Sequence, residues 1–461
     1  MNYPEILKYL PGIEPPIKHL TLKDKLKWTG IVLILFFALS QIIVWGIDPQ
    51  AVQHFLFLET VLGSRMGSLI TLGIGPIVTA SIILQLLVGS GILKWNTGSR
   101  DGRMKFMGTQ KLLAIFFCIF ESFAFVYFGA IPPESGGITP ILIMLQLTLG
   151  GLLIILMDEV VSKWGIGSGV SLFIAAGVSK TIMIRALNFV GAGSPTGLIP
   201  SSIMSFMSGR PLEGIVSLIP IFFTIIIFLI VTYGQSMKVE IPLAFGMVRG
   251  FSMKGFGYRH PLKFIYASNI PVILTAALLS NIEMVARTLY SKGITILGTF
   301  NADGRPISGL AYYLTPPRGH TLSDLIISWI YGVSLPPEAI TWITYSIFLI
   351  GGSILFSVFW INTAGMDAKS VAKQLHTGGL GLPGFRRDIR IIERVLERYI
   401  TPLAVMGGAF VGFLAAFADF TGALGTGTGI LLTVMIIYRL YEDISKQHME
   451  DLHPALRKFF E

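Results

Sequence analysis

The chain has 461 residues, of which 52% are hydrophobic and 13% charged, and its formal net charge is +9. An ordinary soluble domain carries roughly a quarter charged residues, so this composition excludes a soluble globule and predicts a protein dissolved in a lipid bilayer. The single cysteine, Cys118, excludes a disulfide framework, and the Cys and His residues nowhere have metal-ligand spacing. Nucleic-acid binding is a secondary explanation of the basic charge, because Lys and Arg first set the topology of membrane proteins.

The chain begins with a polar segment, residues 1–30, for which we predict a short amphipathic helix on the cytosolic membrane surface. Within it, Thr21-Leu22-Lys23-Asp24 has the pattern of a helix-capping box. The apolar run that follows lacks a small-residue cleavage site, so it is predicted to be an uncleaved membrane span rather than a secretory signal.

Ten apolar runs are long enough to cross about 30 Å of hydrocarbon. In chain order they are Ile31–Ile47, Leu69–Leu93, Leu112–Ile131, Ile138–Met157, Trp164–Asn188, Gly214–Met237, Phe264–Ile282, Ala339–Ile361, Pro402–Ala418 and Phe420–Tyr438. An even number of spans puts both termini on one side, and if that side is cytosolic, 27 of the 35 Lys and Arg residues fall in cytosolic segments. The sequence therefore predicts an all-α polytopic membrane protein with cytosolic N- and C-termini.

Two short motifs occur once in each half of the chain. Gly75–Ala80 in span two resembles Ile270–Ala276 in span seven, and Gly165–Val170 in span five resembles Gly425–Ile430 in span ten. Because each half has five spans, a duplicated half must be inverted relative to its twin. The predicted divisions are a first half (31–190), an external hinge loop (191–213), a second half (214–438) that includes an external loop (287–338), and a cytosolic tail (439–461).

The Gly-x-Gly-x-Gly pattern of the second motif also occurs in nucleotide-binding loops. Here no strand precedes it and no acidic residue follows about twenty positions later, so nucleotide binding is rejected. Two explanations stay open: the glycines allow close helix packing, or they keep a helix wall thin where something passes.

Polar groups are scarce in the predicted spans. All seven histidines lie outside them, and Glu121 is the clear mid-span charge. A charge there costs ~2.5–3.5 kcal/mol, so Glu121 should face protein or water, and a hydrogen bond to a neighbouring span is its simplest role. Asp158, Glu159, Glu283 and Asp419 lie at span ends, where water can solvate them. An intramembrane hydrolase lacks its buried His or Asp pair, and the stronger alternative, a secondary transporter with inverted repeats, lacks its mid-membrane ion site.

Residues 48–65, between spans one and two, contain an apolar stretch too short to cross a membrane and too hydrophobic for a plain external loop. We predict a short helix that re-enters a cavity at the external side. An interfacial helix is the alternative.

Three motifs together resemble the SecY family, the pore-forming alpha subunit of the Sec translocon. They are Ser68–Ser81, Ser268–Leu274 and Gly425–Leu432. The resemblance runs over essentially the whole chain and includes two basic cytosolic loops, 238–263 and 362–401. Ala372-Lys373-Gln374 and Gly384–Arg387 are similar to the archaeal and eukaryotic branch, and the short tail is similar to archaeal members. The resemblance implies ten helices in two inverted five-helix halves around an hourglass pore.

The resemblance also implies a ring of aliphatic side chains that pinches the pore at mid-membrane. The matching residues are Ile74, Val78, Val170, Ile174, Ile273 and Leu432. Two pairs, in spans two and five, are spaced i, i+4 and so lie on one helix face, and such a ring can exclude water and ions by dewetting. Val170 departs from the isoleucine that is frequent in the family, which should loosen the ring slightly. Taken singly, each residue also fits ordinary core packing.

Two moving parts are implied as well. Residues 55–65 match a plug that closes the outer funnel at rest, with plug residues Phe55, Leu56, Phe57, Leu58, Val61, Leu62 and Arg65. Thr79, Glu121 and Asn269 match a polar cluster at a lateral gate between spans two and seven. The halves would part about the external hinge and let a hydrophobic signal sequence reach lipid.

The basic loops imply docking of the translating ribosome through its RNA phosphates, although membrane topology alone also explains them. The candidate docking residues are Arg249, Lys254, Arg259, Arg386 and Arg387, with Arg386 the best single candidate. Further implied partners are a SecE/gamma subunit, a small beta subunit, signal peptides, nascent chains and membrane lipids. The resemblance implies a passive channel in the archaeal plasma membrane, without a cofactor and without enzymatic activity.

Overall fold

The computed structural model describes most of the chain. The described residues are 12–18, 20–47, 67–89, 91–95, 100–127, 131–134, 137–189, 196–245, 258–267, 270–291, 293–301, 306–316, 321–330, 332, 339–377, 380–381 and 388–452. Helices dominate this part of the chain, and each of the ten predicted spans overlaps one of them. The predicted helical, membrane-spanning fold is confirmed.

The helices of the first half follow the predicted spans one to five. They are α2 (Leu22–Leu39), α4 (Gly75–Gly89), α5 (Arg100–Tyr127), α6 (Thr139–Trp164) and α7 (Gly169–Leu187). Thr21 caps α2, as predicted, by accepting a hydrogen bond from the amide of Asp24 at 3.4 Å. The helix that starts there continues without a break into span one, so residue 30 is not a helix boundary. The charged turns of α2 are the polar beginning of an apolar helix.

The helices of the second half follow spans six to ten. They are α9 (Pro211–Ser236), α10 (Ile270–Ser291), α13 (Ala339–Thr363), α15 (Ile389–Phe420) and α16 (Gly427–Leu452). Shorter helices occupy the connections: α8 (Leu198–Met207), α11 (Leu310–Leu314), α12 (Leu322–Ile330) and α14 (Ala368–Thr377). The segment predicted as a hinge loop thus contains the helix α8, which packs against α9. α15 begins well before the predicted span nine, because hydropathy indicates which part of a helix lies in lipid and not where the helix begins.

Six helical stretches among the described residues are long and apolar enough to cross a membrane. They are Gly102–Tyr127, Thr139–Trp164, Gly169–Leu187, Pro211–Ser236, Ile340–Thr377 and Ile389–Phe420. Large apolar side chains on their outward faces are exposed, such as Ile141 and Leu145 of α6 and Phe222 and Leu229 of α9. Water would disfavour such faces, whereas the hydrocarbon core of a bilayer solvates them.

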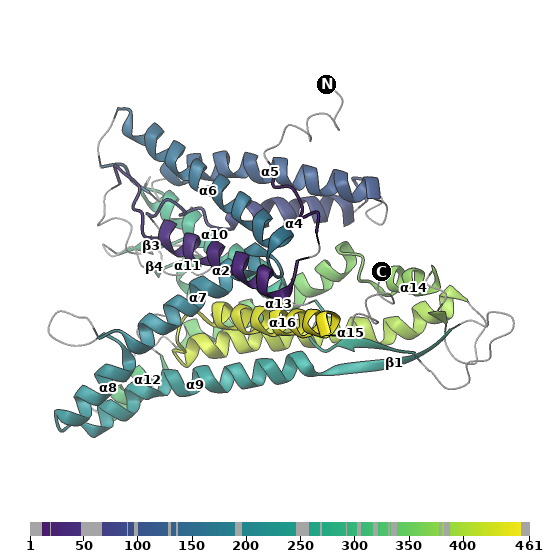
Figure 1. Ribbon diagram of the computed structural model, residues 1–461. Coiled ribbons are helices and arrows are strands. Elements are labelled where there is room, and N and C mark those ends of the chain that lie inside the picture. The colour runs from purple at the N-terminus through teal and green to yellow at the C-terminus, as the bar shows by residue number, and fades with distance from the viewer. Residues whose placement is uncertain are drawn as a thin grey trace.

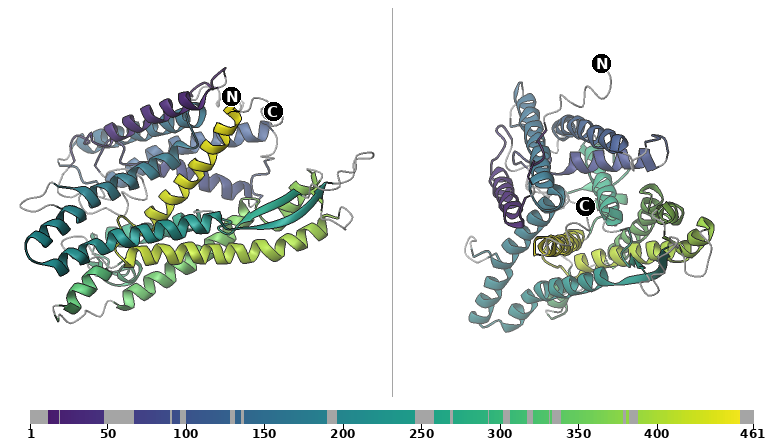
Figure 2. Two further views of the ribbon diagram at one scale, coloured as in Figure 1. Left: turned by 60° about the horizontal axis from the view of Figure 1, so that its bottom comes forward. Right: turned by 45° about the vertical axis from the view of Figure 1, so that its right-hand side comes forward.

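Each half has its own hydrophobic core. Helices α2 and α4–α7 share one core, in which Phe36 of α2 stacks on Phe173 of α7 with ring centroids 4.8 Å apart. Helices α9, α10, α13, α15 and α16 share another, around Tyr345 and Leu349. The halves meet where α16 packs on α7 and where α4 packs on α13. Figure 1 shows α4–α6 on one side of the molecule and α9, α15 and α16 on the other, and Figure 2 shows the same division from two further directions.

The first basic loop folds as a β-hairpin, which the sequence analysis did not predict. β1 (Lys238–Phe245) and β2 (Tyr258–Lys263) pair antiparallel, with Ile241 opposite His260. β5 (Leu380–Gly381), from the second basic loop, adds to the free edge of β1. Ile241 and Leu262 are buried against α14 and α15, which anchors the hairpin. A second small sheet joins β3 (Thr299–Phe300) to β4 (Pro306–Ser308).

Candidate functional site

The six aliphatic residues of the predicted ring lie in one hydrophobic cluster, which we call the collar. Ile74, Ile174 and Leu432 are buried there, and Val78, Val170 and Ile273 pack against them half-buried. They come from four segments, α4 with the turn before it, α7, α10 and α16, and therefore from both halves of the chain. The rest of this cluster is mostly the core of the first half, to which the second half adds Ile273, Leu432 and Ile436.

A tight turn places the first collar residues at the start of α4. Gly73 has φ of +53°, a left-handed conformation that glycine adopts without strain. The chain then enters α4, and the amide of Val78 donates to the carbonyl of Ile74 at 3.0 Å. The two side chains therefore lie one helical turn apart on the same face, as their spacing predicts.

The collar residues of α7 and α16 lie near helix N-termini that approach the preceding helix very closely. A Cβ on Gly169 would lie 2.6 Å from Cα of Asp158, and a Cβ on Gly427 would lie 2.0 Å from the carbonyl oxygen of Ala415. No larger residue fits at either position without movement of the backbone. At these two positions, the close-packing explanation of the Gly-x-Gly-x-Gly motif holds.

Carboxylates that were expected to be solvated have protein partners instead. Asp158 accepts a hydrogen bond from the amide of Val170 at 2.9 Å, and Asp419 accepts one from the amide of Gly427 at 2.7 Å. Glu159 pairs with Lys111 and Lys163, in both cases at 2.6 Å. These contacts could not be predicted from the sequence, because backbone amides have no sequence signature. The acidic residue shortly before each glycine motif is the one available signal.

Two of the three predicted lateral-gate residues lie together. The hydroxyl of Thr79, on α4, donates to Oε1 of Glu121, on α5, at 3.4 Å. Both side chains are half-buried. Glu121 thus faces protein and bonds a neighbouring helix, while Asn269 lies outside the described residues.

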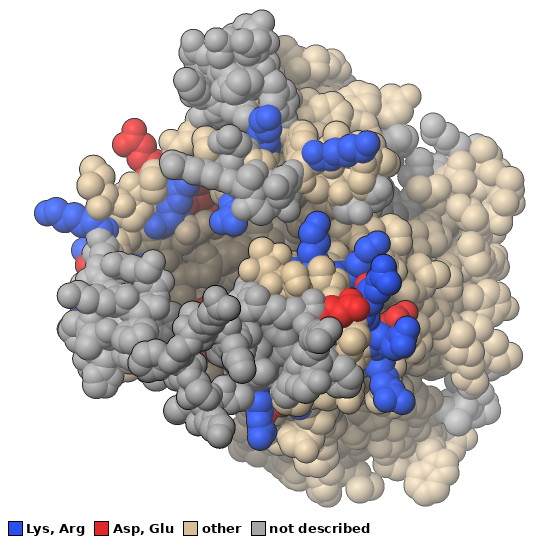
Figure 3. All heavy atoms as spheres, turned by 90° about the vertical axis from the view of Figure 1, so that its right-hand side faces the viewer, with Lys and Arg blue, Asp and Glu red and all other residues tan. Residues whose placement is uncertain are grey.

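The plug and most docking residues also lie outside the described residues. They are Phe55, Leu56, Phe57, Leu58, Val61, Leu62 and Arg65 for the plug, and Arg249, Lys254, Arg386 and Arg387 for docking. Arg259 is described: its side chain, on β2, is 71% exposed and pairs with Glu240 at 3.1 Å. Figure 3 shows Lys and Arg side chains gathered on this end of the molecule, around a hollow. We call it the hairpin end.

A pocket of about 350 Å³ opens at the hairpin end between the two halves. Its walls come from the first half and from β2, Tyr266, Met366 and α16 of the second half; the first-half residues are Ile166, Gly167, Ser168, Ser171 and Leu172. Two lining residues, Leu172 and Ile436, belong to the same hydrophobic cluster as the collar. At its rim, Nζ of Lys263 lies 3.0 Å from Oε2 of Glu442. The pocket therefore leads from a charged rim toward the collar.

A second space, of about 530 Å³, also lies between the halves. Gln85, Trp95 and Arg103 line it from the α4–α5 side, and Asn362 and Ser370 line it from the α13–α14 side. This space and the packing of α4 on α13 mark the seam along which α4 faces the second half.

The charged side chains of the hairpin form ion pairs with one another. Lys238 and Arg259 both bond the Glu240 carboxylate and lower its pKa. Partial burial of the His260 ring lowers its pKa, because desolvation disfavours the charged form. The Glu240 carboxylate is therefore ionised at neutral pH and lies beside the Arg259 guanidinium. Among the described residues, no group of three His, Cys, Asp or Glu side chains could hold a metal ion.

Comparison with known proteins places the chain in a family. The SecY family model matches residues 68–441. The protein translocase subunit SecY of Methanocaldococcus jannaschii is 47% identical over 456 residues, which make up 98% of each chain. Its counterpart in Pyrococcus horikoshii is 43% identical over 475 residues, covering 98% of this chain and 97% of that one.

Comparison with solved structures indicates the same family. A protein-conducting channel has a TM-score of 0.79 at 44% identity and covers 99% of both chains. Sec61 in a canine ribosome–channel complex from the endoplasmic reticulum has a TM-score of 0.77 at 44% identity, again over 99% of both chains. The resemblance predicted from three motifs is confirmed, and the chain belongs to the SecY family.

Proposed function

We propose that this chain is the pore-forming subunit of a protein-conducting channel. Unfolded polypeptides cross the membrane through it, and hydrophobic segments leave it sideways into lipid. The relatives are translocase subunits and the similar structures are protein-conducting channels. The single observation that carries the proposal for this chain is the convergence of six aliphatic side chains from both halves on one cluster. The channel is a passive conduit, and a partner supplies the energy.

The collar is the barrier of the proposed pore. Aliphatic side chains offer water and ions no hydrogen bonds, so a narrow ring of them stays dry. The same side chains can shift rotamers around a polypeptide of any sequence, because no specific bond has to be broken. The rim of the pocket at the hairpin end mixes acidic, basic and hydroxyl groups, which suits a vestibule for chains of varied charge.

The lateral gate and the plug complete the proposed mechanism. Thr79 of α4 and Glu121 of α5 bond each other within the first half, and Asn269 would bond this pair across the gate from the start of span seven. Such hydrogen bonds are worth only about 1 kcal/mol net, so a hydrophobic signal sequence can displace them. The segment 55–65 would cover the collar from the external side until a translocating chain displaces it.

The proposed topology has ten spans, with both termini and the hairpin end in the cytosol of an archaeal cell. Supporting contacts bring the first turns of α2 and the middle of α16 to the hairpin end. Thr29 accepts a hydrogen bond from the amide of Ile166, and Glu442 pairs with Lys263. The charge asymmetry of the sequence supports the orientation. The ribosome would bind the basic hairpin end, as the ribosome complex of the similar Sec61 suggests. A SecE/gamma subunit and a small beta subunit would complete the channel.

The test is site-specific crosslinking to a stalled secretory chain. Photoreactive probes at Ile74, Ile273 and Leu432 should label the arrested polypeptide. Matched probes on outward positions of the same helices, Leu278 on α10 and Ile437 on α16, are 39% and 44% exposed and should label lipid. Labelling of the polypeptide at the outward positions alone would remove the pore assignment.

A further inference from the structure

Asp158 does for α7 what a capping residue ordinarily does. The N-cap residue of α7, Ser168, makes no side-chain cap bond. Instead, the amide of Val170 donates a hydrogen bond at 2.9 Å to Asp158 of α6, which lies twelve residues before Val170. The first amides of a helix lack partners within the helix, so this carboxylate satisfies one of them from outside. The amide that it holds belongs to a collar residue.

Asp419 also binds the start of α16 in the other half, where it adds to an ordinary cap in which the Thr426 hydroxyl accepts from the amide of Gly429 at 3.2 Å. Its Oδ1 accepts from the amide of Gly427, the first residue of α16, at 2.7 Å. Its Oδ2 accepts from the hydroxyl of Tyr345 at 2.7 Å, and Tyr345 is 1% exposed in the core of the second half. Both oxygens of Asp419 are therefore engaged, and the bonds fix the start of α16 relative to α13 and α15.

The two arrangements share a geometry. In each half, a carboxylate near the end of one helix binds the N-terminus of the next, where the helix dipole favours negative charge. Glycine at that N-terminus removes the Cβ that would block the approach. The bonds are charge-assisted and are therefore stronger than those between neutral groups. Each helix held in this way delivers collar side chains: Val170 and Ile174 from α7, and Leu432 from α16.

We propose that Asp158 and Asp419 are positioning residues of the collar: they fix the first turns of α7 and α16 and so set how tightly the resting pore is closed. The proposal rests on the proposed function, since without a collar there is no closure to set. Helices α7 and α16 also pack on each other. A displacement of the first turn of either helix would therefore move the collar residues of one half relative to those of the other half.

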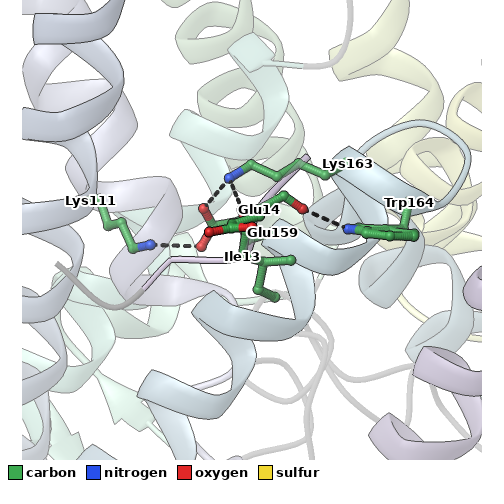
Figure 4. A network of polar contacts seen from close by, with 6 residues as sticks. All are labelled: Ile13, Glu14, Lys111, Glu159, Lys163 and Trp164. Atoms are coloured by element: carbon green, nitrogen blue, oxygen red, sulfur yellow. Dashed lines mark hydrogen bonds and ion pairs between the residues drawn. The ribbon is translucent and has the colours of Figure 1, made fainter. Parts of the chain in front are cut away.

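Glu159 is the matched control. It lies beside Asp158 at the same end of α6, but its partners are Lys111 on α5 and Lys163 on α6. Figure 4 shows the surrounding network, in which Lys163 also bonds the backbone of Ile13, and Trp164 donates to the carbonyl of Glu14 at 2.9 Å. In this network Glu159 ties the N-terminal segment and α5 to α6. Glu159→Gln thus alters a carboxylate at the same helix end without changing the contact at Val170.

The experiment measures the resting ion leak of the full chain, reconstituted with its proposed small subunits, in liposomes loaded with a halide-sensitive dye. Asp158→Leu and Asp419→Leu should raise the leak roughly tenfold, the population change that loss of a charge-assisted hydrogen bond brings. Asp158→Asn keeps an acceptor oxygen but loses the charge, so its leak should lie between those of the parent and Asp158→Leu. Glu159→Gln should leave the leak unchanged, and Leu432→Gly, which opens the collar directly, should raise it most.

Two results separate this inference from the proposed function. If Leu432→Gly leaks and the aspartate variants leak no more than Glu159→Gln, the positioning role is wrong and the collar stands. If Leu432→Gly does not leak either, the collar itself is wrong. Tyr345→Phe removes one donor to Asp419 without added bulk, which covers the case in which the leucine variants fail to fold. It should raise the leak about threefold, and an unchanged leak would contradict the role of Asp419.

Discussion

The collar and the basic hairpin lie along one proposed path but are built on opposite principles. The collar gathers six aliphatic side chains from four segments, and the side chains meet by shape alone. The hairpin presents exposed charges, with Lys238 and Arg259 paired to Glu240 at 3.1 Å. Packing in the collar depends on side-chain volume and is insensitive to salt, whereas attraction at the hairpin falls as salt screens it.

The collar and the hairpin therefore select in different ways. A barrier that must admit any polypeptide has no use for specific bonds, so it relies on dryness. A surface that must find one partner benefits from charge, because charge guides long-range association. Substitutions that change volume or polarity should therefore act at the collar, and substitutions that change charge should act at the hairpin.

The largest effect is expected when a charge is placed in the collar. Leu432→Asp puts a carboxylate among apolar side chains, where an unpaired ion costs several kcal/mol, and it should draw water into the ring. Ion leak through the resting channel should rise at least tenfold. Leu432→Met, which conserves volume at a cost under about 1.5 kcal/mol, is the control. Equal leak in the two variants would show that Leu432 does not line the barrier.

A smaller effect is expected from charge reversal on the hairpin. Arg259→Glu should weaken ribosome binding about fivefold at low salt, and the difference should shrink as salt rises. Arg210→Glu reverses another exposed arginine, which precedes α9 and pairs with Glu213 at 3.7 Å. Ribosome binding by this control should equal that of the parent. A salt-independent loss for Arg259→Glu would contradict electrostatic docking.

The polar pair at the seam should give a modest effect. Thr79→Val keeps the shape of the side chain and removes the hydroxyl that would meet Asn269 of span seven across the proposed gate, so the open gate should become about threefold more populated. The measurement is export of a substrate with a weakened signal sequence, which should improve. Asn269→Leu should act in the same direction. An unchanged signal-sequence requirement in both variants would count against the gate.

The smallest effect is expected from Glu240, whose ionised carboxylate competes with phosphates for Arg259. Glu240→Gln should tighten ribosome binding about twofold at low salt. Because Lys238 and Arg259 lower the pKa of Glu240, the ion pairs should persist at neutral pH. They should be lost only as the pH falls through that lowered pKa, which NMR titration of the labelled hairpin would detect. A normal or raised pKa would contradict the pairing.

Much of the helical framework could be predicted from the sequence, because runs that cross hydrocarbon must be long and apolar. The ends of the helices were harder to predict. Span nine was predicted from Pro402, yet α15 begins at Ile389, because its first turns pack against the hairpin rather than lipid. The hairpin itself was missed, since its short strands carry Pro242 and Pro261 and many charges, which weakens any strand signal.

The candidate site was predictable only in part. Periodicity placed Ile74 with Val78 and Val170 with Ile174, but the grouping of these pairs with Ile273 and Leu432 came from motif resemblance. Distant segments that meet in space leave no pattern along the chain. The same holds for Asp158 and Asp419, which were expected to face water, because their partners are backbone amides reached only after the chain turns back.

The most direct test of the collar asks whether its residues contact the same part of a translocating chain. Single cysteines at Ile74, Ile273 and Leu432, in a Cys118→Ala background, are offered to cysteines placed one by one along a stalled polypeptide. If the three residues form one ring, each should form disulfides with the same short stretch of the arrested chain. Disulfides at widely separated stretches, or only with lipid-inserted segments, would show that no common ring exists.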